Sequence, residues 1–311
     1  MKNLRKITAI ILCIILSSFA FINTDAKIKP QPSAKGPGTS VFNGQEILML
    51  ANQSESQMMS YIITTKNKKL IVVDGGLDLD AEHLRQAIIA RGGKVSAWFI
   101  SHPHSDHVGA LVKLINDGLQ EISIDAVYYN FVDDDWYKRN EAYRADMVIK
   151  AKEAFNKLGS EKLHGNIKTG DLIQVDDVKI HVLNDPYLFT VNSINNSSVA
   201  LRMEIGSKRV LFLGDMGPEA GAALLKDVGA AGLKADIVQM AHHGQYGVEK
   251  NVYEAIRPSI CMWNSPAWLY DNDNGGGIGS GKWLTLQVRA WMDELGVTKH
   301  FVIKDGDQLI K

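Results

Sequence analysis

The sequence predicts a layered domain of mixed strands and helices, of the α/β or α+β class. Two observations support this. Apolar runs at 61–64 and 70–73 are split by a polar turn, which is typical of a hairpin. Farther along, apolar runs such as 95–100 alternate with segments of helical periodicity such as 81–91. Hairpins mixed with strand–helix units favour a layered domain over a purely parallel sheet.

The expected elements follow from the same signals, taken in order. Helices are marked by apolar residues at helical spacing and by the glycines that end them, as Gly92 and Gly159 do. Strands are marked by short β-rich runs bounded by turn residues. We expect strands at 61–64, 70–73, 95–100, 126–131, 172–175, 178–183, 199–205, 209–213 and 237–240, and helices at 81–91, 108–115, 140–158 and 284–295.

Composition excludes several classes of protein. The 34 Lys and Arg residues nearly balance 35 Asp and Glu, so the net charge of −1 gives no general attraction for nucleic acid or an anionic membrane. We therefore expect no sequence-specific nucleic-acid partner. The two cysteines, Cys13 and Cys261, are too few for a disulfide scaffold or a Cys-rich zinc site.

The first forty residues have the features of a targeting segment and a linker rather than of the folded domain. Three positive charges in 1–6 precede an apolar run at 7–22, and small and polar residues follow up to Ala26. An uncleaved anchor is the alternative, but the run is shorter than the ~20 apolar residues that span a bilayer. We expect a signal peptide at 1–26, a flexible linker at 27–40 and a folded domain at 41–311. The mature protein would then be secreted, periplasmic or on the cell surface, with no stable membrane span.

The strongest chemical signal is the segment 101–107, which follows a predicted strand. It holds three histidines and one aspartate, namely His102, His104, Asp106 and His107. Imidazole and carboxylate groups are ligands of zinc, and of manganese or iron where oxygen ligands predominate. Structural zinc sites usually close with cysteines, which are absent here. The segment therefore predicts a metal site of the catalytic kind.

This His-x-His-x-Asp-His pattern after a strand resembles the signature of the metallo-β-lactamase-fold hydrolases. Asp215 after the strand 209–213, and the pair His242-His243 after 237–240, also resemble that family. The resemblance implies a four-layer αββα sandwich with a two-metal site. It further implies the following ligands: His102 and His104 for the first metal, Asp106, His107 and His242 for the second, and Asp215 between the two metals.

His243 is the rival of His242. Neighbouring residues of an extended segment point to opposite faces, so one of the two is expected to be the ligand. We favour His242, because it would share a face with the last apolar residue, Met240. His243 would then protonate the leaving group, and Asp106 would orient the attacking hydroxide as well as bind metal.

One segment departs from the family pattern. Many members carry another histidine for the first metal ahead of the strand at 199–205, but this chain has an Asn- and Ser-rich loop there. Asn195, Asn196 and Ser197 are the expected substrate contacts, with an asparagine as a possible oxygen ligand. We expect two divalent metals, zinc first, with manganese or iron as alternatives.

The order of this loop (195–201), the segment 212–215 and the segment 241–244 is similar to that in the extracellular hydrolase domain of DNA-uptake competence proteins. Cell-surface phosphorylcholine esterases share this resemblance. The resemblance implies an exported, metal-dependent hydrolase that uses a metal-bridging hydroxide on phosphodiester bonds. Its partner would be a small-molecule or polymer substrate with such a bond. The alternatives are a β-lactam or lactone hydrolase of the same fold, or a non-catalytic binding module that contains metal.

Overall fold

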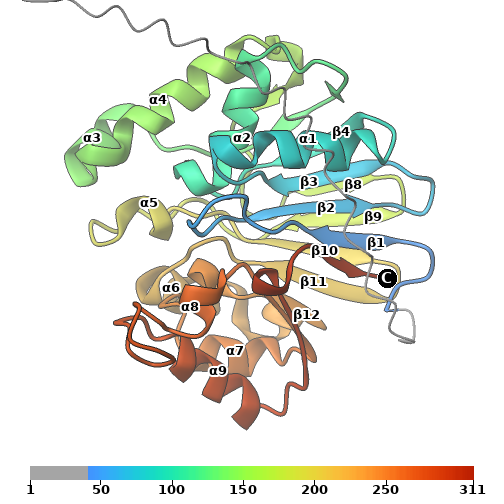
Figure 1. The fold of residues 1–311 in the computed structure, drawn as a ribbon. Helices are drawn as coiled ribbons and strands as arrows, with labels where there is room; N and C mark the ends of the chain where they lie inside the picture. Colours follow the sequence, from blue (N-terminus) through green and yellow to red (C-terminus); the bar gives the residue numbers. More distant parts are fainter. Residues whose placement is uncertain (1–40) are drawn as a thin grey trace, which may run out of the picture. The chain divides into compact units, whose positions relative to one another are not determined.

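Two β-sheets pack face to face, and helices cover the outer side of each sheet (Figure 1). The computed structural model describes residues 41–311. The predicted signal peptide and linker lie outside the described residues. Within 41–311, no helix combines the length and the apolar character that a membrane crossing needs.

The first sheet is eight-stranded within the described part of the chain. Its strands follow the order β15-β1-β2-β3-β4-β6-β7, with β5 paired to β4. Pairing is antiparallel from β15 to β3 and parallel from β3 to β7. The strands are β1 (Glu46–Met49), β2 (Ser60–Thr64), β3 (Leu70–Asp74), β4 (Lys94–Phe99), β5 (Ser123–Ile124), β6 (Val127–Tyr128), β7 (Leu163–His164) and β15 (Gln308–Ile310).

The second sheet has the order β14-β13-β12-β11-β10-β9-β8. Its pairing is antiparallel from β8 to β11 and parallel from β11 to β14. The strands are β8 (Leu172–Val175), β9 (Val178–Val182), β10 (Leu201–Ile205), β11 (Lys208–Phe212), β12 (Ile237–Gln239), β13 (Ile260–Trp263) and β14 (Lys299–Val302).

Helices form the two outer layers. Buried residues of α1 (Ala81–Ile89), α2 (Ser105–Asn116) and α4 (Ala142–Asn156) pack on the first sheet, and those of α6 (Pro218–Leu233), α7 (Lys250–Ile256) and α9 (Thr285–Glu294) pack on the second. The remaining helices are α3 (Asp134–Asn140), α5 (Ser193–Asn196), α8 (Ala267–Tyr270) and the 3-10 turns η1 (Asp78–Asp80), η2 (Ser160–Lys162), η3 (Ala241–Gly244) and η4 (Ile303–Asp305).

Strand alternation divides the apolar side chains between layers. In β3, Ile71 and Val73 join the cluster between the sheets, while Leu70 and Val72 face the helices. Because both faces of these strands are buried, their sequences read as continuous apolar runs. The predicted mixed α/β class, with two sheets between helical layers, is confirmed.

Several predicted boundaries are wrong. The helix expected at 140–158 is α4, which is shorter and covers 142–156, and a helix that was not predicted, α3, precedes it. The two helices are separated at Glu141 by a non-helical backbone (φ −152°). The helix expected at 108–115 begins earlier, at Ser105, so Asp106 and His107 lie in its first turn. The strand expected at 237–240 ends at Gln239. The last two differences affect how the site is built.

Candidate metal centre

Four strands deliver the residues of the site. In each sheet two parallel neighbours, β3 with β4 and β11 with β12, end at the same edge. Asp74 is the last residue of β3, and the segments that follow β4, β11 and β12 carry the motif 101–107, Asp215 and His243. Gly214 allows the close approach of Asp215, since its backbone has φ +57° and a Cβ there would lie 2.8 Å from Ser198 Oγ.

Four side chains, those of Asp106, His107, Asp215 and His243, meet at this edge. One ligand atom from each lies within 4.8 Å of the others. Oδ2 of Asp215 is 3.2 Å from Nε2 of His107 and 3.1 Å from Nε2 of His243. Nε2 of His243 is also 3.3 Å from Oδ2 of Asp106, whose side chain is 17 % exposed. The group is thus buried, with one partly open side at Asp106.

The donor atoms in this group fit a metal ion. Nε2 of His107, Nε2 of His243 and Oδ1 of Asp215 are buried, and among residues 41–311 none has a hydrogen-bond partner. Buried polar atoms are rarely left without a partner, so several such atoms that point toward one place indicate a cation-binding site. Two imidazoles and two carboxylates suit zinc, iron or manganese.

Partners behind the two histidines fix which nitrogen faces the group. Nδ1 of His107 donates to Oδ2 of Asp74 at 2.7 Å. Nδ1 of His243 lies 3.1 Å from the carbonyl of Asn264, to which it donates. Both Nε2 atoms therefore keep their lone pairs for a metal, which is the usual arrangement of metal-binding histidines.

The charges of the group act strongly on one another. Burial alone would lower the pKa of His243, but Asp215 and Asp106 raise it to about 9. Burial would raise the pKa of Asp215, but His107 and His243 bring it well below its usual range. The two carboxylates thus concentrate negative charge beside the histidines, so a cation is favoured at this place.

His102 and His104 form a second cluster beside this group. Nε2 of His102 is 3.1 Å from Nδ1 of His104, and the ring of His102 is 4.1 Å from that of His107. Nε2 of His104 is 3.3 Å from Oε1 of Glu141 and 3.0 Å from Nη1 of Arg144. Burial, with the neighbouring histidines, holds the pKa of His102 well below its usual range.

His242 lies outside the group of four. Its Nδ1 is 3.0 Å from the carbonyl of Tyr246, and its Nε2 is 3.2 Å from Nδ2 of Asn195. The sequence expectation rested on strand alternation, but the strand ends at Gln239 and both histidines have positive φ (52° and 55°). Such backbone is uncommon outside glycine and is often found at functional sites. The structure thus places His243, and not His242, with the other ligand candidates.

The three expected substrate contacts in the Asn- and Ser-rich loop differ in the hydrogen bonds that they form. Oδ1 of Asn195 is buried and lacks a partner among the described residues, whereas its Nδ2 contacts His242. Oδ1 of Asn196 accepts from the backbone of Gly217 and Ala220 at the start of α6. Oγ of Ser197 donates to the carbonyl of Ile194. Of the three, Asn195 is the one with an atom left for a ligand.

Three residues near the site were not singled out in the sequence. Asp74 ends an apolar strand immediately before Gly75-Gly76, and that position is the signal that marks it. Glu141 and Arg144 lie in a helical region with no motif, so nothing in the pattern distinguishes them from surface charges.

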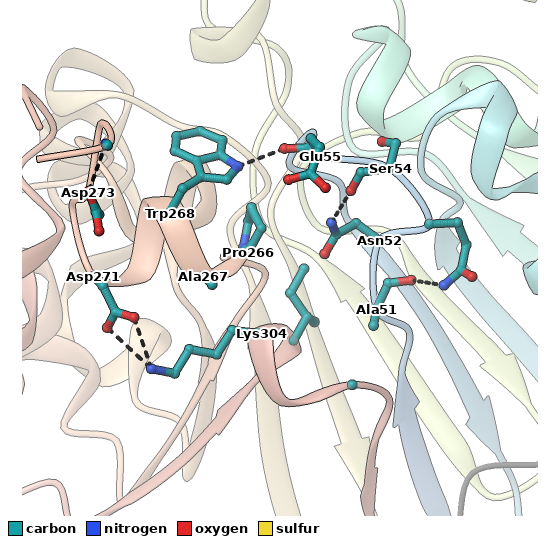
Figure 2. Close-up of a pocket in the computed structure, with 14 residues that line it drawn as sticks. Ala51, Asn52, Ser54, Glu55, Pro266, Ala267, Trp268, Asp271, Asp273 and Lys304 are labelled. Atoms are coloured by element: carbon teal, nitrogen blue, oxygen red, sulfur yellow. Dashed lines mark hydrogen bonds and ion pairs between the residues drawn. The ribbon is translucent and has the colours of Figure 1, made fainter. Parts of the chain in front are cut away.

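A pocket of about 800 Å³ is lined by the segments that follow β1, β13 and β14 (Figure 2). One wall is formed by 51–55 and the other by 266–275, and Nε1 of Trp268 donates to the carbonyl of Glu55 across it at 2.7 Å. Each wall continues toward the metal group, since Gln57 lies 3.5 Å from Asp106 and Ser265 contacts the carbonyl of His243. The pocket lining is polar apart from the Trp268 ring and a few aliphatic side chains.

Comparison with known proteins places the chain among related folds. The family model described as "Metallo-beta-lactamase superfamily" matches residues 55–258. A search of curated proteins gave no match.

Solved structures with the same fold share little sequence with the chain. YhfI from Bacillus subtilis, a metallo-beta-lactamase fold protein, is 11% identical, with a TM-score of 0.51 over 85% of this chain and 99% of its own. CmlA from Streptomyces venezuelae, a diiron β-hydroxylase, is 11% identical, with a TM-score of 0.52 over 86% of this chain and 54% of its own. Zn(2+)-bound PqqB from Methylobacterium extorquens is 10% identical, with a TM-score of 0.50 over 86% and 99%. At these identities the likeness concerns the fold.

Proposed function

The chain belongs to the metallo-beta-lactamase superfamily. We propose that it is an exported, metal-dependent phosphodiester hydrolase. The observation that carries the proposal is the set of buried, unpartnered donor atoms of His107, His243 and Asp215 beside Asp106. We assign His243 in place of His242 as the histidine of the second metal. Zinc is the metal we favour, with iron and manganese to be tested beside it.

Six residues are proposed as metal ligands, and one histidine beside them is proposed for proton transfer. His102 and His104 would hold the first metal, and Asp106, His107 and His243 the second, with Asp215 shared between them. Metals bound here would lower the pKa of water toward about 7 and offset charge that develops on the attacked group. Asp106, partly exposed, is placed to orient the attacking water, and His242, next to the group, is the histidine we assign to proton transfer.

A phosphodiester is favoured by the charges at the edge of the site. Arg144 lies 3.0 Å from His104, and its side chain is 46% exposed, so its guanidinium can also reach a bound anion. Arginine donors match phosphoryl oxygens geometrically. The unpartnered amide oxygen of Asn195 is the second polar atom there. The group that is cleaved in a lactam or a lactone is uncharged, so it would gain little from Arg144.

The pocket between 51–55 and 266–275 would take the rest of the substrate. Its Trp268 ring and its polar lining, which includes Asn52, Ser54 and Asp271, suit a hydrophilic substituent rather than a lipid tail. A small molecule or the end of a polymer with a phosphodiester bond are both compatible with this volume.

The test is a substrate panel on the metal-loaded protein. Protein stripped with a chelator and reloaded with zinc, iron or manganese is assayed against bis-p-nitrophenyl phosphate, a choline phosphodiester, a lactone and a β-lactam. We expect the phosphodiesters to be hydrolysed fastest. Asp215→Ala should abolish turnover and lose metal while the fold is retained. A β-lactam or lactone cleaved far faster than any phosphodiester would contradict the proposed substrate class.

Export is tested separately, by the N-terminal sequence of the protein recovered from outside the cytoplasm. We expect it to begin after Ala26. A protein that stays in the cytoplasm with Met1 in place would contradict the export proposal and leave the chemistry untouched.

A further inference from the structure

Glu141 is a buried carboxylate that touches the first-metal cluster from outside the family motif. It lies at the start of α4, is 7% exposed, and its Oε1 is 3.3 Å from Nε2 of His104. We propose that Glu141 is the positioning residue of the first metal: it holds His104 in the tautomer that presents Nδ1 to the ion. This inference rests on the two-metal centre proposed above.

The hydrogen bonds around His102 and His104 support this assignment. Ser101 Oγ donates to Asp74 at 2.7 Å, so it accepts from Nδ1 of His102 at 3.0 Å. The lone pair on Nε2 of His102 then faces Nδ1 of His104 at 3.1 Å. If Nε2 of His104 donates to Glu141, its Nδ1 carries a lone pair too. Two lone pairs at this distance repel unless a cation lies between them.

The second oxygen of Glu141 is fixed by the loop that lacks the expected histidine. Oε2 accepts from Oγ of Ser193 at 2.9 Å and from the backbone of Ile194 at 3.0 Å. Two donors on one oxygen are the pattern expected of an ionised carboxylate, which can only accept. Glu141 therefore connects α4, the Asn-rich loop and His104, and is poised to orient the ligand rather than to bind the metal.

Arg144 competes for the same nitrogen. Its Nη1 lies 3.0 Å from Nε2 of His104, where it could donate only if that nitrogen were unprotonated. That tautomer would place a proton on Nδ1, between the two histidines, and would exclude the metal. Glu141 opposes it, because a carboxylate can only accept. Metal loading should thus transfer the hydrogen bond of Nε2 from Arg144 to Glu141.

The experiment compares Glu141→Ala, Glu141→Gln and Glu141→Asp, with Glu153→Ala as the matched control. Glu153 is exposed on the same helix. Zinc affinity is measured by chelator competition, metal content by elemental analysis, and the ring tautomer of His104 by nitrogen NMR of the loaded protein. Because partners of ligating histidines contribute 10–100-fold to metal affinity, E141A should weaken the first metal by about that factor. The second metal should be retained.

Glutamine has one acceptor oxygen where Glu141 uses two, so it can serve His104 only at the expense of Ser193 and Ile194. E141Q should therefore bind the first metal more tightly than E141A but more weakly than the unmodified protein. Aspartate is too short to reach His104, so E141D should resemble E141A. If E141A does not fold, E141D and E141Q are compared instead. Equal loss in E141Q and E141A with the ring tautomer of His104 unchanged would overturn the positioning role in favour of direct coordination. Two metals bound normally by a folded E141A or E141D would overturn it entirely. Neither result depends on which substrate is cleaved.

Discussion

Oδ2 of Asp74 lies 2.7 Å from Nδ1 of His107, whose other ring nitrogen faces Asp215. Asp74→Asn removes the charge but keeps a side chain that tolerates the positive φ of this position (55°). We expect zinc at the second site to bind about 10–100-fold more weakly, because the ring of His107 loses the carboxylate that orients it. Chelator competition measures the change, and Asp78→Asn, at an exposed position nearby, is the control. Unchanged affinity in D74N would show that the carboxylate does not support the ligand.

The neighbouring histidines His242 and His243 should behave differently when replaced. His243→Ala removes a buried ring from the group of four, so we expect loss of one metal and of nearly all turnover. His242→Ala should keep both metals, because its nitrogens contact Tyr246 and Asn195 instead. Metal content and kcat, measured on both variants, separate the two roles. The opposite pattern, with metal lost from H242A alone, would contradict the assignment of His243.

Arg144→Ala should raise KM for an anionic phosphodiester about 10–100-fold, since a hydrogen bond to a charged group contributes roughly 1.5–3 kcal/mol. The KM for a neutral ester should change little, and Arg144→Lys should restore part of the binding. Arg139→Ala, at an exposed position on α3, is the matched control. Equal effects on anionic and neutral substrates would contradict a role in anion binding.

His83 lies away from the site, and it should make the free energy of unfolding depend on pH. Its Nε2 lies 2.9 Å from Oδ1 of Asp307, and this hydrogen bond raises the pKa of His83 against the opposing effect of burial, with a smaller contribution from Asp80. A raised pKa stabilises the fold fully below about 6.5, and the contribution is lost as the pH rises through the folded value. His83→Gln should therefore lower the free energy of unfolding more at pH 5.5 than at pH 9. The difference should be at most about 1 kcal/mol for this partly exposed pair.

Urea unfolding at both pH values measures this difference. Asp307→Asn removes the partner charge, so in that background His83→Gln should show little dependence on pH. A difference that grows toward high pH would have the wrong sign for this pair.

Cys261 should resist thiol reagents until the domain unfolds. It is fully buried in β13, and burial raises the pKa of its thiol. We expect its labelling rate in native buffer to follow global unfolding and to rise to that of a free thiol in denaturant. Fast labelling of the native protein would show that β13 opens locally.

The sequence predicted the layered class and the edge of the sheets that carries the site, because the motif, Asp215 and the histidine pair each follow an apolar strand. It did not predict which histidine of the pair turns inward, since that depends on the two positive φ angles of 242 and 243. Backbone of this kind leaves no periodic signal. Glu141 and Arg144 were missed because their role depends on the packing of α4 against a loop fifty residues farther along the chain.

The pairing of β15 with β1 brings Ile310 opposite Ile47. Contacts between positions this distant along the chain form late, because the intervening residues must be ordered first. During synthesis the outer edge of β1 therefore stays open until the end of the described chain has left the ribosome. An open edge of this kind can pair with other chains. A chain that is cut before its last strand would therefore keep this edge of the first sheet unpaired.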